Sequence, residues 1–140
     1  MDMKAFNRDL IAEFRANKGK LGGRFENSTL VLLTTTGAKS GRPHTVPLGW
    51  VPDGDDDRIV LFASNIGAAK HPAWYVNLVA YPEATIELRG EKFTVNATTF
   101  VGGAEYDRLY ELLTSQLAGT DTHQGRTERT IPMVLAQRLL

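Results

Sequence analysis

The segment at residues 30–48, LVLLTTTGAKSGRPHTVPL, limits the folds open to this chain more than any other segment. An apolar run leads into three threonines, then into a turn bracketed by Gly37 and Gly41, and then into a second extended run. Glycine allows positive φ angles and lets a ligand come close to the backbone. The segment therefore predicts two antiparallel strands joined by a tight turn.

The turn also contains groups that suit an anion. Thr36 and Ser40 offer hydroxyls, and Lys39 and Arg42 offer fixed positive charges. Unbonded backbone N–H groups would complete a nest for a phosphate or a carboxylate. An ordinary hairpin with solvated charges explains the same residues, because hairpin turns favour glycine and polar side chains. The residues alone leave both interpretations open.

Short extended runs separated by turn residues cover most of the chain. The patterns predict six strands, at residues 29–35, 43–51, 58–64, 84–89, 92–101 and 130–139. They predict three helices, at residues 3–17, 70–78 and 104–117. Most of the strands follow one another through tight turns, which indicates a mainly antiparallel sheet. We therefore expect one α+β domain over residues 1–140, mainly β, in which the sheet forms a small, partly open barrel.

The predicted N-terminal helix has an apolar stripe formed by Phe6, Leu10, Ile11 and Phe14. This spacing is typical of a helix that packs on or beside a sheet. A lid, or a weak contact with a membrane surface, is the alternative. The charges on its polar face are of both signs, which disfavours purely electrostatic attachment to a membrane.

The composition excludes several classes of function. Lys and Arg together number 16, as do Asp and Glu, so the formal net charge is zero. Nucleic-acid-binding proteins usually have a basic excess, so we expect no nucleic-acid partner. The chain has no cysteine, which excludes disulfides and thiolate chemistry and fits a cytoplasmic protein. No apolar run approaches the ~18 residues that would cross a bilayer.

A second segment with an unusual composition is ASNIGAAKHPAWY, at residues 63–75. Ser64 ends a predicted buried strand, Gly67 leaves room for a ligand, and the N-terminus of the following helix offers N–H groups with partial positive charge. Trp74 either presents a flat wall to a planar ligand or belongs to the core. No nucleophile triad is evident, and the histidines lack metal-ligand spacing, so we expect no metal site.

These two segments, together with RTERTIPMVL near the C-terminus, resemble the deazaflavin-dependent nitroreductase family, whose members use coenzyme F420. The similarity extends over about residues 20–138 and rests mainly on LLTTTGAKSGRPHTVPL and ASNIGAAKHPAWYVNLVAYPEATIEL. The resemblance implies a split β-barrel of the FMN-binding type, as in the pyridoxamine-phosphate oxidase group. It also implies hydride transfer from reduced F420 to a quinone-like, nitro or activated-alkene acceptor.

The resemblance implies two sets of cofactor-binding residues. The first set would hold the phosphate and the acidic oligoglutamate tail of F420, or lie beside them: Thr36, Gly37, Lys39, Ser40, Gly41, Arg42, His44, Pro47 and Arg129. The second set would follow the deazaflavin ring and frame the pocket: Ser64, Asn65, Gly67, Ala68, Ala69, Lys70, Trp74 and Tyr75. Asn77 would orient this second segment.

The resemblance also suggests where the acceptor is activated. Negative charge grows on the acceptor oxygen as the hydride arrives, and Ser64 is the candidate to stabilise that charge by a hydrogen bond. His123 is the weaker candidate, as an acid. Nitroimidazole-reducing members have several tyrosines in the loop before the last strand. That loop, at residues 117–129 here, has no tyrosine, which counts against nitroimidazole reduction.

Two other functions fit the same fold. One is a carrier protein that binds F420 without turnover, and the other is a reductase that uses FMN, because Lys39 and Arg42 would serve either phosphate. Split barrels are often dimers, so a homodimer is an open alternative to a monomer.

Overall fold

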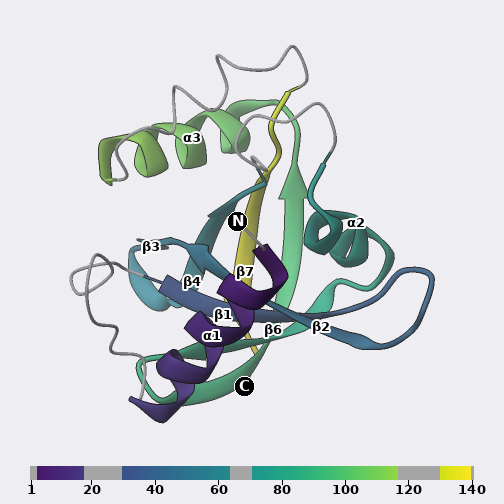
Figure 1. The fold of residues 1–140 in the computed structure, drawn as a ribbon. Coiled ribbons are helices and arrows are strands. Elements are labelled where there is room, and N and C mark those ends of the chain that lie inside the picture. The colour runs from purple at the N-terminus through teal and green to yellow at the C-terminus, as the bar shows by residue number, and fades with distance from the viewer. Residues whose placement is uncertain (1–2, 18–29, 64–70, 117–129, 140) are drawn as a thin grey trace.

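A computed structural model describes residues 3–17, 30–63, 71–116 and 130–139 of the chain (Figure 1). These residues form the helices α1 (Met3–Ala16), α2 (Ala73–Ala80) and α3 (Ala104–Gln116). They also form the strands β1 (Leu30–Thr36), β2 (Pro43–Gly49), β3 (Val51–Asp53), β4 (Asp55–Phe62), β5 (Glu83–Leu88), β6 (Glu91–Phe100) and β7 (Met133–Arg138).

The strands form one sheet in the order β2-β1-β5-β6-β7-β4-β3, and every neighbouring pair is antiparallel. The two edge strands, β2 and β3, are consecutive in the sequence and are separated by Trp50 alone. The sheet must therefore curl until its two edges approach each other at Trp50. This confirms the predicted antiparallel, barrel-like fold.

The prediction of six strands is wrong, because the described residues form seven. The run at residues 43–51, expected as one strand, divides at Trp50. Gly49 pairs with Leu30 of β1, whereas Val51 pairs with Val60 of β4. Partners at opposite edges of the sheet thus impose a change of direction that the apolar pattern of the run does not reveal.

Three other element boundaries also differ from the sequence prediction. β4 begins at Asp55 rather than at Arg58, directly after a turn in which Gly54 has a φ of +89°. α2 begins at Ala73 because Pro72 has an extended backbone and is its N-cap. β7 begins at Met133, after Pro132, which has no N–H to donate to a strand partner.

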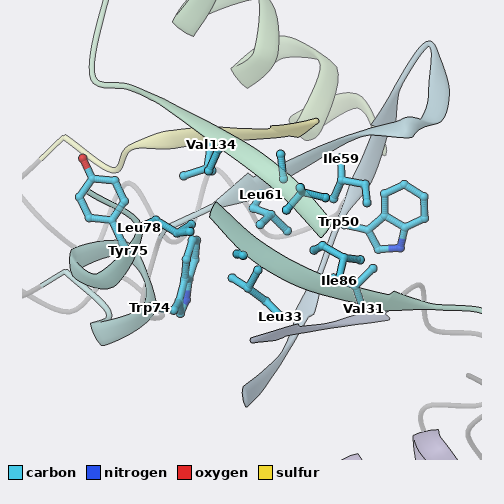
Figure 2. Close-up of a cluster of buried hydrophobic side chains, with 14 of the residues drawn as sticks. Val31, Leu33, Trp50, Ile59, Leu61, Trp74, Tyr75, Leu78, Ile86 and Val134 are labelled. Carbon is cyan, nitrogen blue, oxygen red and sulfur yellow. The ribbon is translucent and has the colours of Figure 1, made fainter. Parts of the chain in front are cut away.

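The main core fills the concave side of the curled sheet. Val31 and Leu33 of β1 meet Ile59 and Leu61 of β4 there, and all four side chains are fully buried. Figure 2 shows Trp50 at one end of this cluster and the α2 aromatics Trp74 and Tyr75 at the other. The cluster thus connects the place where the sheet edges meet with the helix that borders the candidate site.

The helices α1 and α3 cover the outer face of the sheet, which explains the continuous apolar runs of β1 and β4. Leu32, between two core residues of β1, packs against Leu10 and Phe14 of α1. Val60 of β4 belongs in the same way to a cluster with residues of α3. Strands that are buried on both faces read as unbroken apolar runs.

Leu10 and Phe14, two residues of the apolar stripe of α1, are buried by this packing. Their burial contributes roughly 1.5–3 kcal/mol for each side chain. In the described part of the chain, no helix combines the length and the apolar character needed to span a membrane.

Candidate functional site

A cavity of about 970 Å3 lies between α1, the turn that joins β1 to β2, the start of β2, and α2. Its volume is at the upper end of the range for sites that hold small molecules and cofactors. Figure 1 shows α1, in purple, crossing the sheet in front of β1 and β2, with α2 on the other side of the β1–β2 hairpin.

The β1–β2 turn forms the first wall and is closed by its own hydrogen bonds. The Gly37 N–H donates to the Arg42 carbonyl (2.8 Å), and the Gly41 N–H donates to the Gly37 carbonyl (2.9 Å). The Arg42 N–H donates to Ser40 Oγ (3.1 Å). Gly41 has a φ of +69°, which only glycine adopts without strain.

These hydrogen bonds leave fewer N–H groups for an anion than the sequence suggested. The sequence suggested that the turn offers several unbonded N–H groups, but closing the turn uses three of them. The Ala38 N–H is bonded as well, to Asn77. Among the described residues, only the N–H groups of Lys39 and Ser40 within residues 37–42 lack a protein partner.

Gly37 is needed here because side chains pack against its backbone. A Cβ at this position would collide with Ser40 Oγ and lie 2.9 Å from His44 Nε2. Ser40 Oγ and His44 Nε2 are themselves 3.3 Å apart, so the turn and the start of β2 are held together at this point. All three residues line the cavity.

Asn77 fixes the second wall, α2, to the first. Its side chain is 7% exposed and lines the cavity. Its Nδ2 donates to Thr35 Oγ1 of β1 (3.0 Å), and its Oδ1 accepts from the Ala38 N–H (2.9 Å). One buried amide therefore sets the position of the turn relative to α2.

The aromatic residues of α2 divide between core and cavity. Trp74 packs in the core and also lines the cavity, and its contact with a planar ligand stays a prediction. Tyr75 packs in the core, with its ring 4.9 Å from the ring of His71, and is not part of the cavity wall. Val76, which is about half exposed, extends the apolar part of the wall beside Trp74.

The third wall is α1, and sequence reasoning did not find it. Its cavity-lining residues are Asn7, Arg8, Ile11, Ala12 and Arg15. These residues recur at helical spacing along one face of α1. That spacing is the sequence pattern from which this wall could have been predicted. Arg15 makes two hydrogen bonds to Glu87 of β5, at 3.0 and 2.8 Å, and this pairing raises the pKa of Arg15 above its usual value.

The structure brings together some of the cofactor-binding residues expected from the sequence. Those that line the cavity are Gly37, Lys39, Ser40, His44 and Trp74. Those that are described but do not line it are Thr36, Gly41, Arg42, Pro47 and Tyr75. Those outside the described residues are Ser64, Asn65, Gly67, Ala68, Ala69, Lys70, His123 and Arg129. Their roles stay predictions.

Thr35, rather than Thr36, reaches the cavity. Side chains alternate between the two faces of a strand, so neighbouring threonines point in opposite directions. Thr35 is 2% exposed and bonded to Asn77, whereas Thr36 does not line the cavity.

The charged residues described in the cavity lining are all basic. They are Arg8, Arg15 and Lys39, with His44 beside them, and none of the described lining residues is an aspartate or a glutamate. The chain as a whole has equal numbers of acidic and basic residues, so folding concentrates basic residues at the cavity. Such a wall suits an anionic ligand with an apolar, planar part that can lie near Trp74.

A curled antiparallel sheet with such a cavity beside its first hairpin defines the split-barrel class of cofactor-binding proteins. A solved structure described as a pyridoxamine 5'-phosphate oxidase homologue from Listeria innocua shares this fold, with a TM-score of 0.55 and 11% identity over 83% of this chain and 88% of that one. At this identity the likeness shows the fold alone.

Within this class the chain belongs to the F420H(2)-dependent quinone reductase family, whose model matches residues 6–138. The F420H(2)-dependent quinone reductase Rv1261c of Mycobacterium tuberculosis is 36% identical over 130 residues, which is 91% of this chain and 86% of that protein. A solved F420-H2 dependent reductase (FDR-A) is 31% identical, with a TM-score of 0.69 over 78% of this chain and 94% of that one. A structure described as a domain-swapped dimer is 28% identical, with a TM-score of 0.72 over 97% of this chain and 98% of the other.

Membership of this family identifies the chain as an oxidoreductase that transfers a hydride from reduced F420 to a quinone. It supports an enzyme over a carrier, and F420 over FMN. The cavity fits this coenzyme, because F420 has an acidic tail and a flat ring, and the lining has cations without carboxylates next to an indole.

Proposed function

We propose that the cavity is the place where this chain binds F420 and brings the quinone to it. The turn at residues 37–42 and the start of β2 would hold the anionic part of the coenzyme, and Trp74 would lie against its ring. The observation that supports this most strongly is the lining itself, whose described residues include Arg8, Arg15, Lys39 and His44 but no carboxylate.

The residues of the chain would bind and orient, while the bound coenzyme supplies the hydride. A hydride acceptor must come within ~3–3.5 Å of the donor carbon, so the walls have to fix both partners. Trp74 and Val76 give an apolar surface that excludes water, and Asn77 keeps this surface at a fixed position relative to Lys39. Ser64 and His123 remain the proposed groups that stabilise and protonate the acceptor oxygen.

The range of acceptors and the setting of the enzyme are also proposals. Nitroaromatic and enone-like compounds can take a hydride in the same way as a quinone. A homodimer is supported by the structural relative that is described as a domain-swapped dimer. We further propose a cytoplasmic enzyme with at most weak peripheral membrane contact, since Leu10 and Phe14 of α1 are buried against the sheet.

Substitution of Lys39 tests the proposed site. Lys39 is exposed at the turn and lines the cavity, so Lys39→Ala removes a charge-assisted contact with the coenzyme. We expect affinity for F420 to fall by about ten- to hundredfold, which corresponds to about 1.5–3 kcal/mol. Equilibrium binding of F420 measures this, with the unfolding free energy measured in parallel.

Two further variants complete the test. Lys92→Ala is the matched control, because Lys92 is an exposed lysine on β6 that does not line the cavity. Arg42→Ala should act mainly on coenzyme with long glutamate tails, since Arg42 lies at the turn but outside the lining. An unchanged dissociation constant for Lys39→Ala would remove the turn from the site.

A further inference from the structure

We propose that α1 is part of the coenzyme site and that Arg8 contacts the anionic part of F420. This inference rests on the proposed function of the cavity and names a binding residue on a wall separate from the β1–β2 turn. Four observations support it: the distribution of charge on α1, the state of its two arginines, the packing of the helix, and the chemistry of guanidinium.

The charges of α1 are sorted by face. Among its described side chains, Arg8 and Arg15 line the cavity, whereas Asp9 and Glu13 do not. In the sequence these four residues form a polar face of mixed sign. Folding thus turns both of these arginines toward the cavity and leaves both carboxylates outside it.

The two arginines are in different states. Arg15 is engaged in two hydrogen bonds with Glu87, so it fastens α1 to β5. Among the described residues, the one ionic partner of Arg8 is Asp9, at a loose 3.7 Å, and the Arg8 side chain is 76% exposed. Exposed pairs of this kind contribute little, so Arg8 can leave Asp9 for a ligand at small cost.

The packing of α1 keeps Arg8 within reach of the cavity. Leu10 and Phe14 anchor the helix on Leu32, and Ile11, which packs beside them, also lines the cavity. These apolar contacts and the Arg15–Glu87 pair lie within about two helical turns on the C-terminal side of Arg8, and they hold that part of the helix against the sheet. A guanidinium held there can bind a phosphate or a carboxylate through two N–H groups at once.

Binding of two deazaflavins to Arg8→Ala tests this inference. One ligand is F420, and the other is the same deazaflavin with its ribityl chain but without phosphate or glutamates. We expect the dissociation constant for F420 to rise by about fivefold, as for a partly solvated charge contact. The dissociation constant for the ligand without the tail should stay unchanged, because it has no anionic group for Arg8.

Three comparison variants make the result specific. Glu13→Gln changes a charge on α1 outside the cavity and should bind both ligands as the wild type does. Arg8→Lys keeps the charge without the two-pronged geometry and should recover part of the lost affinity. Arg15→Ala should lower the unfolding free energy, whereas Arg8→Ala should leave it unchanged.

The outcomes separate this inference from the proposed function. If Lys39→Ala weakens F420 binding and Arg8→Ala does not, α1 does not bind the coenzyme and the cavity assignment stands. An equal loss of affinity for both ligands in Arg8→Ala would also overturn the inference, because the effect would then not involve the anionic tail. If neither variant affects binding, both proposals fail.

Discussion

Two groups of arginine and lysine residues in this molecule differ in what surrounds them. At the cavity, Arg8 and Lys39 belong to a lining whose described residues include no carboxylate. On the α3 side of the sheet, Arg58 and Arg108 converge on Asp53, with N–O distances of 2.9 and 2.7 Å. The comparison teaches that the same residue types serve structure where carboxylates pair with them, and that they keep their charge available for the proposed coenzyme where no described carboxylate does.

The paired group connects elements that are distant in the sequence. Asp53 ends β3, Arg58 lies on β4, and Arg108 lies on α3, where it also bonds to Glu105. The hydrogen bond from Arg108 is the largest cause that lowers the pKa of Asp53, to about 2. This group therefore stabilises one end of the barrel by charge, and the cavity group leaves its charge available.

The largest expected effect comes from the residue that fixes the cavity walls. Asn77→Leu has a similar volume but leaves the Ala38 N–H and the Thr35 hydroxyl without their partner. We expect the unfolding free energy to drop by about 2–4 kcal/mol and F420 affinity to fall as well, because the turn loses its position. Chemical denaturation and coenzyme binding measure the two effects.

The exposed Val79 on the same helix provides the control for Asn77→Leu. Val79→Ala should change the unfolding free energy by less than about 0.5 kcal/mol and leave binding intact. If Asn77→Leu lowered stability but left F420 affinity unchanged, the position of the turn would not matter for the coenzyme.

A smaller effect is expected from the paired group. Asp53→Asn keeps the shape of the side chain and removes its charge, so both arginines lose an ionic partner at a site whose carboxylate is 12% exposed. The expected loss of unfolding free energy is about 1–2 kcal/mol. F420 affinity should not change, and a measurable change would show that the two regions are coupled.

The smallest effect is the pH dependence of the unfolding free energy that the Asp53 carboxylate contributes. The folded-state pKa of Asp53, about 2, lies below its usual value of 3.8. A carboxyl with a depressed pKa stabilises the folded state fully above its usual pKa and loses this contribution as the pH falls through the folded value. The difference in unfolding free energy between wild type and Asp53→Asn should therefore shrink between about pH 5 and pH 2. A constant difference over this range would contradict the pairing.

Sequence reasoning succeeded where the signal was local. The hairpin at residues 30–48 followed from its glycines, and the antiparallel sheet followed from short connections. Gly41 has the positive φ that the sequence suggested, whereas Gly37 is needed because side chains of the chain itself pack against its backbone.

Sequence reasoning failed where the structure depends on contacts between residues that are far apart in the chain. The break at Trp50 arises because β2 and β3 pair at opposite edges of the sheet. The role of α1 in the cavity depends on which of its faces meets the hairpin, and a polar face of mixed sign does not show this in advance. The choice of Thr35 over Thr36 depends on the strand's orientation relative to α2.

The most direct test of the cavity assignment is a titration with oxidised F420 that follows tryptophan fluorescence, with FMN in parallel. Trp74 lines the cavity, whereas Trp50 is buried at the other end of the core (Figure 2). The account predicts saturable quenching by F420, little response to FMN, and loss of most of the quenching in Trp74→Phe. Binding of the variant is checked independently by ultrafiltration. Undiminished quenching in a Trp74→Phe variant that still binds F420 would place the ring elsewhere and contradict the assignment of the cavity.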